Sequence, residues 1–214
     1  METYRTIEET DESLETLYEI QKSKFITHLR HVDSEEEARD FIQAMKKRYY
    51  DARHNCSAYI LGERGDKQKS NDDGEPGGTA GAPILEAIKQ NGLTDIVVVV
   101  TRYFGGIKLG AGGLIRAYSH AAVLGLEAAT KLEITPFQEI NVTLSYDLLA
   151  TVENYLRKES IRTGETEYAE NVTIPLLLSP GEVEQRLTEL TDLTSARFTH
   201  KKGRLISLPL KIQN

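Results

Sequence analysis

Five consecutive β-branched residues, Ile96-Val-Val-Val-Val100, constrain the fold of this 214-residue sequence more than any other segment. Neighbouring residues of a strand point to opposite faces of a sheet, so this run predicts a central strand that is buried on both faces. Helical spacing precedes the run over residues 80–90 and follows it from about residue 110 to 131. Helix, buried strand and helix together predict an α/β layer.

The residues before this layer predict further strands and a helix. Residues 15–32 alternate between apolar and polar side chains, which indicates a hairpin or two short strands. Ser34 is followed by three glutamates and then by apolar residues at helical spacing, so a helix is expected to begin there. Residues 57–61 indicate another strand, and Thr79 is the expected N-cap of the helix over residues 80–90.

Pro136 and its neighbours, residues 133–137, indicate a linker between two domains. The pattern after it predicts the order βαββαβ, which is the ferredoxin-like arrangement of two split βαβ units. The expected elements are strands at 140–144, 162–169, 172–178 and 205–212, with helices near 148–156 and from 180. The sequence therefore predicts an N-terminal domain over residues 1–135 and a ferredoxin-like domain over residues 136–214.

Composition narrows the class of protein. A net charge of −7 argues against a generally basic nucleic-acid binder but leaves room for a local basic patch. Cys56 is the only cysteine, so no internal disulfide can form, and a reducing cytoplasmic location is expected. The acidic N-terminus has no apolar segment typical of a secretory signal, and the longest apolar runs are too short to span a bilayer. No membrane partner is expected.

Two glycine-dense stretches, residues 71–83 and 101–118, each lead into a predicted helix. Glycine allows unusual backbone conformations and close approach, and free amides at a helix start attract anions. The second stretch also contains Arg102, Lys108 and Arg116, which favours binding of a phosphate-bearing partner. The alternative is a tight strand-to-helix turn in which glycine is needed only for the geometry of the turn and for close packing. Neither a Walker loop nor a dinucleotide-binding glycine pattern is present.

Asp72, Asp73 and Glu75 could bind a divalent cation, because carboxylate oxygens are its preferred ligands. Their spacing does not match a calcium loop, and Asp-Gly and Pro-Gly pairs favour a solvated turn instead. His54 and Cys56 could form a zinc pair or a Cys–His nucleophile site. No further ligand spacing accompanies them, and a single buried cysteine more often acts as a small apolar residue. We therefore expect no catalytic residue, metal or cofactor.

Arg102, Tyr103 and Phe104 end the predicted buried strand. Strand ends of α/β layers often border clefts, and aromatic rings beside arginine can stack bases and contact phosphate. The alternative is that Phe104 belongs to the core and that Arg102 is an ordinary surface charge. Basic residues at positions 22–30 and 46–53 could extend such a surface.

The glycine-rich motifs closely resemble the signature blocks of the IMPACT family. The matching segments are Ser23-Lys-Phe-Ile26, Asp51-Ala-Arg-His-Asn-Cys-Ser-Ala-Tyr59, Asn71-Asp-Asp-Gly-Glu-Pro-Gly-Gly-Thr-Ala-Gly-Ala-Pro83 and Val99-Val-Thr-Arg-Tyr-Phe-Gly-Gly-Ile-Lys-Leu-Gly-Ala-Gly-Gly-Leu-Ile-Arg-Ala-Tyr118. The resemblance covers most of residues 18–130, and the tail resembles the second domain of bacterial members.

This resemblance implies an α+β fold for both domains. The N-terminal domain would have a βαβ crossover like domain IV of elongation factor G and a domain of a small-subunit ribosomal protein. The C-terminal ferredoxin-like domain would be like domain V of the same factor. Eukaryotic members regulate translation by competing for an activator of an initiation-factor kinase, through a recognition domain that this chain lacks. For bacterial members the resemblance implies a link to nucleic acid or the ribosome.

Three functions remain open. The leading hypothesis is a translation-linked regulatory factor that binds RNA or the ribosome and that is not an enzyme. The second is an enzyme acting on a phosphorylated small molecule or nucleotide, with Asp73 or Glu75 holding magnesium. The third is a protein-interaction adaptor that could bind translation-associated proteins. The expected binding residues are His54, Asp73, Glu75, Thr79, Arg102, Tyr103, Phe104, Gly105, Gly106, Lys108, Gly110, Gly113, Arg116 and Tyr118.

Overall fold

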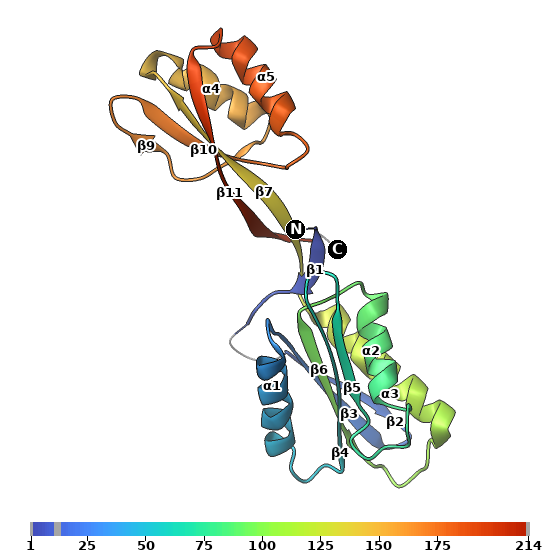
Figure 1. The fold of residues 1–214 in the computed structure, drawn as a ribbon. Helices are drawn as coiled ribbons and strands as arrows, with labels where there is room; N and C mark the ends of the chain where they lie inside the picture. Colours follow the sequence, from blue (N-terminus) through green and yellow to red (C-terminus); the bar gives the residue numbers. More distant parts are fainter. Residues whose placement is uncertain (1, 11–13, 213–214) are drawn as a thin grey trace. The chain divides into compact units, whose positions relative to one another are not determined.

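The computed structural model describes residues 2–10 and 14–212 (Figure 1). They form two compact units. The N-terminal unit contains Glu2–Ile134 together with the residues from Pro209, and the C-terminal unit contains Thr135–Leu208. In the described part of the chain, no helix is long and apolar enough to cross a membrane.

The N-terminal unit contains a five-stranded sheet in the order β2-β3-β6-β4-β5. The strands are β2 (Leu14–Ile20), β3 (Ser23–His31), β6 (Ile96–Tyr103), β4 (His54–Leu61) and β5 (Lys67–Asn71). Every neighbouring pair is antiparallel. Because β3 and β4 both run antiparallel to β6, they are parallel to each other, and the helix α1 (Glu35–Arg48) between them is a crossover connection.

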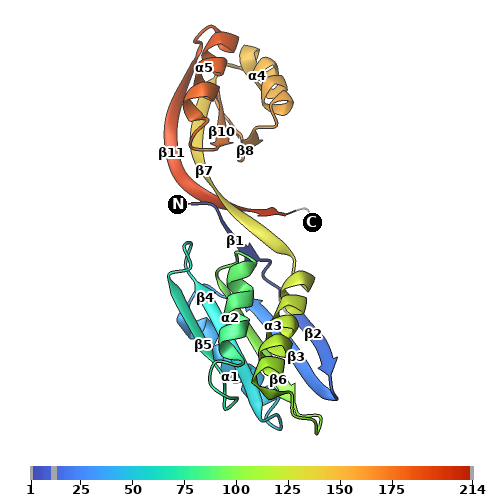
Figure 2. The ribbon, with the colours of Figure 1, turned by 90° about the vertical axis from the view of Figure 1, so that its right-hand side faces the viewer.

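The predicted central strand is confirmed as β6, and it is buried on both faces. Val98 and Val100 face the core beneath α2 (Gly81–Gln90) and α3 (Gly110–Ala128). Val97 and Val99 face the core beneath α1. Figures 1 and 2 show α1 on one side of the sheet and α2 and α3 on the other. This sandwich explains why every position of the β-branched run is apolar.

The helix α1 begins where the sequence predicts. The Ser34 hydroxyl accepts a hydrogen bond from the Glu37 amide at 3.2 Å, and the Glu37 carboxylate accepts one from the Asp33 amide at 2.8 Å. Three glutamates in the first turn and three basic residues in the last turn complement the helix dipole. Local sequence alone therefore specifies both ends of this helix.

The expected linker at residues 133–137 contains the division between the two units, but these residues form part of strand β7 (Lys131–Leu144) instead of a coil. Its first part pairs with β1 (Tyr4–Ile7), from Lys131 to Ile134. Its last part pairs with β10 (Val172–Leu178), from Gln138 to Leu144. Pro136 lies between these two paired stretches, where its missing amide hydrogen interrupts neither ladder.

The C-terminal unit has the predicted βαββαβ order. The elements after β7 are α4 (Tyr146–Lys158), β8 (Arg162–Thr163), β9 (Glu167–Tyr168), β10, α5 (Val183–Thr194) and β11 (Phe198–Lys211). The strands lie in the order β11-β7-β10-β8, with β9 also paired to β10. This is the order expected of a ferredoxin-like sheet, and its core contains residues of α4, α5, β7 and β10.

Two strand boundaries in this unit differ from the prediction. The strand expected over residues 162–169 is divided into β8 and β9. Three residues between Thr163 and Glu167 face two residues of β10, so a β-bulge interrupts the ladder. The last strand begins at Phe198 instead of Leu205, because polar residues on an exposed strand weaken the apolar pattern.

Candidate functional site

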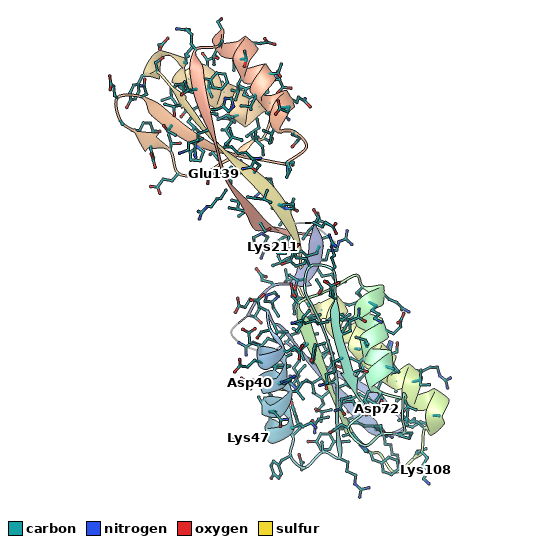
Figure 3. All side chains as sticks on the ribbon, viewed as in Figure 1. Asp40, Lys47, Asp72, Lys108, Glu139 and Lys211 are labelled. Atoms are coloured by element: carbon teal, nitrogen blue, oxygen red, sulfur yellow. The ribbon has the colours of Figure 1, made fainter. Side chains whose placement is uncertain are left out.

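A hollow of about 370 Å³ lies beside the first turn of α3, and we call it the α3 hollow. The ends of β4 and β6, the loop before α2 and the loop before α3 supply its walls. Figure 3 labels Lys108 on the loop that joins β6 to α3. The lining residues are Arg53, His54, Glu75, Pro76, Arg102, Phe104, Lys108, Leu109, Gly110, Ala111 and Leu114.

A buried ion pair underlies this hollow. Arg102 Nη1 donates to Glu75 Oε1 at 2.7 Å, and the two side chains are only 7% and 3% exposed. The hydroxyl of Tyr118 donates to the same carboxylate oxygen at 2.8 Å, and the thiol of Cys56 lies 3.4 Å from that hydroxyl. Burial of a carboxylate is costly without such partners. The network therefore fixes the glycine-rich loop before α2 against β6 and α3.

The guanidinium of Arg102 lies between two aromatic rings. Its Cζ atom is 5.6 Å from the centroid of Phe25 and 5.6 Å from that of Phe104. Phe25 is fully buried, whereas Phe104 is 54% exposed. Among the residues that the structure describes, Arg102 Nε is buried and has no hydrogen-bond partner. The cation is thus held in the interior by Glu75 and two rings, and one of these rings remains accessible.

Asp72 caps α2, which corrects the prediction that Thr79 does so. The Asp72 carboxylate accepts hydrogen bonds from the amides of Gly78, Ala80 and Gly81 at 2.8, 3.0 and 2.8 Å. Burial raises the pKa of Asp72, but these backbone bonds outweigh it and the net shift is downward. The buried Thr79 hydroxyl instead donates to the Pro76 carbonyl oxygen at 2.6 Å.

Asp73 also has structural partners, so the expected turn is present but this carboxylate is not simply solvated. Its carboxylate accepts a hydrogen bond from the Asn55 amide at 2.7 Å and forms an ion pair with Lys46 of α1. His54 Nδ1 lies 3.0 Å from the Asp73 carbonyl oxygen. Together with the buried Glu75, all three acidic residues of this loop are engaged within the fold. Among the described residues, no group of three or more His, Cys, Asp or Glu side chains could hold a metal ion.

The glycines at the start of α3 are required for two different geometric reasons, close packing and a positive φ, which the sequence alone could not distinguish. A Cβ atom at Gly105 would lie 2.0 Å from the Lys22 carbonyl carbon, so β6 and the β2–β3 turn could not approach as they do. Gly106 and Gly110 have φ values of +87° and +70°, which other residues rarely adopt. A Cβ atom on either would meet nothing within 4 Å, so both face open space. Packing thus explains Gly105, and backbone conformation explains Gly106 and Gly110.

Cys56 is a buried thiol held in its neutral form. Burial raises its pKa to about 12, and the carboxylates of Glu75, Asp73 and Asp72 add to the shift. Its Sγ atom also lies 3.0 Å from the Asp72 carbonyl oxygen. A thiolate nucleophile needs a lowered pKa, so this environment is unsuited to nucleophilic chemistry.

The structure brings together six of the expected binding residues and separates the other eight from the hollow. Those that line the hollow are His54, Glu75, Arg102, Phe104, Lys108 and Gly110. Those that do not line it are Asp73, Thr79, Tyr103, Gly105, Gly106, Gly113, Arg116 and Tyr118. Tyr118 is buried, and the Tyr103 hydroxyl donates to Asp51 at 2.8 Å. Arg116 is exposed on α3, so the three cations of the glycine motif do not all converge.

Four lining residues were not expected to bind, namely Pro76, Leu109, Ala111 and Leu114, and Arg53 was expected only as a possible extension of the surface. Arg53 precedes His54 at the start of β4, and antiparallel pairing places His54 opposite Arg102. Sequence reasoning missed this pairing, because the predicted strand begins only at residue 57 whereas β4 begins at His54. Ala111 and Leu114 are three residues apart in α3, and only helix geometry places them on one wall.

The electrostatics of the hollow favour an anion. Three cationic side chains and one carboxylate line it, which gives a formal charge of +2 without His54. The carboxylate belongs to Glu75, which Arg102 and Tyr118 already engage. The first turn of α3 has no acidic residue, and within the described part of the chain no side chain caps it, so its amides have no anionic partner there. Exposed cations, free amides and an accessible ring suit a phosphate-bearing ligand.

The fold defines a class of two-domain α+β protein, and the hollow is its candidate site. Residues 21–126 match the Impact N-terminal domain, and residues 142–197 match a domain of unknown function, DUF1949. The chain belongs to the IMPACT family.

Relatives extend over most of the chain. The IMPACT family member YvyE of Bacillus subtilis (strain 168) is 45% identical over 189 residues, which cover 88% of this chain and 87% of the relative. The IMPACT family member YigZ of Escherichia coli (strain K12) is 36% identical over 178 residues, covering 82% and 87%. A crystal structure described as that of a hypothetical protein has a TM-score of 0.58 at 30% identity, covering 95% of this chain and 98% of that one.

Proposed function

We propose that this protein is a translation-linked regulatory factor that binds RNA, including the RNA of the ribosome, through the α3 hollow. The observation that carries this proposal is the cationic hollow at a helix start, with Arg53 and Lys108 exposed on its rim. Membership of the IMPACT family supports the link to translation. The resemblance described above implies that eukaryotic members of this family regulate translation.

A local cationic site is compatible with the acidic chain. The whole protein has a net charge of −7, whereas the lining of the hollow has a formal charge of +2. Binding follows the local potential, which a concave surface focuses. In the part of the chain that the structure describes, neither Arg53 nor Lys108 forms an ion pair with a carboxylate. Both are therefore available to phosphate oxygens without loss of an internal partner.

The lining residues have distinct proposed roles. Lys108 and Arg53 contact phosphate, the amides of the α3 first turn allow the backbone of the ligand to approach, and Phe104 stacks a base. Arg102 supports Phe104 from below. Arg116 and Tyr103, which lie outside the hollow, would extend the contact surface along α3 and the end of β6.

The proposed fold relationship supports the same role. We propose that the N-terminal unit is related to domain IV of elongation factor G and the C-terminal unit to domain V. The β3–α1–β4 crossover and the β11-β7-β10-β8 order are the features on which this relationship rests. Both would place the protein among factors that act on ribosomes.

An enzymatic role has less support. Magnesium binding by Asp73 or Glu75 would have to displace Lys46 or Arg102 from its carboxylate. The thiol of Cys56 is neutral because burial raises its pKa to about 12. We therefore propose binding without catalysis.

Sedimentation with purified ribosomes across a salt series tests the proposal. Wild-type protein is expected in the ribosomal pellet at low salt, with binding that falls steeply as salt rises. Lys108→Ala should weaken binding, whereas Lys89→Ala, which removes an exposed lysine at the end of α2, should leave it unchanged. Absence of co-sedimentation at low salt, or an equal effect of the two variants, would contradict the proposal.

A further inference from the structure

We propose that the α3 hollow binds the terminal phosphate of an RNA strand, a phosphomonoester, with the adjoining base stacked on Phe104. This inference rests on the proposed function, because it specifies which part of an RNA the hollow takes. The ligand class follows from four features of the hollow: its charge, the start of α3, the buried Arg102 and the exposed ring of Phe104.

The charge of the hollow matches a dianion. Arg53, Arg102 and Lys108 line it against the single carboxylate of Glu75. A phosphomonoester carries a charge of about −1.5 to −2 at neutral pH, whereas an internal phosphodiester carries about −1. The formal charge of +2 is therefore balanced by a terminal phosphate and only half balanced by an internal one.

The start of α3 supplies amide donors. The helix begins at Gly110 after Leu109, no side chain caps it, and no acid lies in its first turn. Gly110 and Ala111 both line the hollow. Gly110 has a φ of +70°, and a Cβ atom there would meet nothing within 4 Å, so a ligand can approach the backbone closely. An oxyanion at this position would face the positive end of a 19-residue helix.

Arg102 contributes a buried cation to the hollow. Its side chain is 7% exposed, and its guanidinium makes one hydrogen bond, to Glu75, within the described residues. Nε is buried without a partner, although buried polar groups are almost always hydrogen-bonded. Arg102 also lines the hollow, so its buried positive charge adds to the attraction for a phosphate there.

Phe104 adds a stacking surface at the same place. One face of its ring lies over the Arg102 guanidinium, with Cζ 5.6 Å from the ring centroid. The side chain is 54% exposed, which is unusual for phenylalanine. A base stacked on the free face would extend the stack of guanidinium and ring. A phosphate bound at the start of α3 and a base stacked on Phe104 together correspond to the terminal nucleotide of an RNA strand.

Equilibrium binding of short fluorescent RNA oligomers to the full-length protein tests the inference. The same sequence is prepared with a 5′-phosphate, with a 3′-phosphate and with hydroxyls at both ends, and adenosine monophosphate is added as a separate ligand. At least one phosphorylated oligomer is expected to bind about tenfold more tightly than the unphosphorylated one, which corresponds to ~1.4 kcal/mol.

Two variants distinguish the contribution of the terminal phosphate to binding from that of the stacked base. Lys108→Gln should abolish the preference for the phosphorylated oligomer, and the matched change Lys89→Gln at an exposed lysine of α2 should preserve it. Phe104→Ala should weaken all oligomers about tenfold while keeping the preference, because stacking does not depend on the terminal phosphate. Tyr50→Ala, at an aromatic residue that is 86% exposed and outside the hollow, should change neither.

The outcomes distinguish this inference from the proposed function. Equal affinity for all three oligomers overturns the terminal-phosphate inference and leaves RNA binding intact. Binding of adenosine monophosphate without binding of any oligomer overturns both in favour of a free nucleotide. No binding of any probe at low salt also overturns both. A phosphate preference that survives Lys108→Gln removes the α3 hollow as its location.

Discussion

Arg102 and Glu75 are 27 residues apart in sequence, yet Arg102 Nη1 donates to Glu75 Oε1 at 2.7 Å in a buried environment. The pair joins the end of the central strand to the glycine-rich loop before α2. Two glycine-rich motifs that lie apart along the chain thereby form one wall of the α3 hollow. The conformation of the candidate site consequently depends on a buried charge pair, and this has measurable consequences.

Removal of one partner of this pair should destabilise the protein strongly. Glu75→Ala leaves Arg102 buried without a counter-charge, so the free energy of unfolding should fall by about 3–5 kcal/mol. The double variant Glu75→Leu with Arg102→Leu removes both charges and should recover most of that loss. Urea denaturation followed by circular dichroism measures both. If the double variant is no more stable than Glu75→Ala, the charge pair is not the cause.

The cap of α2 should depend on Asp72. Asp72→Ala leaves three amides without an acceptor and should lower the free energy of unfolding by about 1–2 kcal/mol. Thr79→Val, which keeps the shape of a residue that does not cap the helix, should cost less. Thermal unfolding of the two variants gives the comparison, and a larger loss for Thr79→Val would contradict the assignment of the cap.

Asp72 should also make stability depend on pH on the acid side. Its folded-state pKa is lowered below the usual value of 3.8, because its backbone hydrogen bonds outweigh the effect of burial. The stabilisation is therefore present above pH 3.8 and is lost as the pH falls through the folded-state pKa. Urea unfolding at pH 6 and below about pH 4 should show the gap between wild type and Asp72→Asn narrowing with acid. A constant gap would argue against a charged cap.

The glycine at position 105 should be irreplaceable for packing. Gly105→Ala places a Cβ atom 2.0 Å from the carbonyl carbon of Lys22, so backbone must move, and a loss of about 1–3 kcal/mol or more is expected. Gly77→Ala in the other glycine stretch meets nothing within 4 Å and should change stability by less than about 0.5 kcal/mol. Chemical denaturation of both variants provides the test, and equal stability would refute the close approach.

Cys56 should reduce stability at alkaline pH. Burial raises its pKa from 9.0 to about 12 in the folded state. The contribution of the neutral thiol to the free energy of unfolding is therefore complete below pH 9, and it is lost as the pH rises toward 12. Across that interval the free energy of unfolding should fall by up to about 1.4 kcal/mol per pH unit because of this thiol. Cys56→Ala should show a shallower decline between pH 8 and 11 in urea unfolding. An unchanged slope would mean that the thiol is not buried as described.

Many elements of the fold follow from local sequence. The β-branched run predicts β6 because a strand buried on both faces tolerates only apolar side chains, and Ser34 with its glutamates predicts the start of α1. The bulge between β8 and β9 and the extended β7 could not be predicted in this way. Both depend on which strand lies opposite, and partner register leaves no periodic signal in a single segment.

The sequence by itself determined the secondary structure of the central layer, the βαββαβ order of the tail and the motifs that relate this protein to its family. Only the tertiary structure decided that Glu75 neutralises Arg102, that Asp72 rather than Thr79 caps α2, and that Lys108 and Arg53 share a hollow without Arg116. The physical reason is range. Helix and strand periodicity act over a few residues, whereas ion pairs, caps from distant loops and concave surfaces depend on contacts between segments that packing alone brings together.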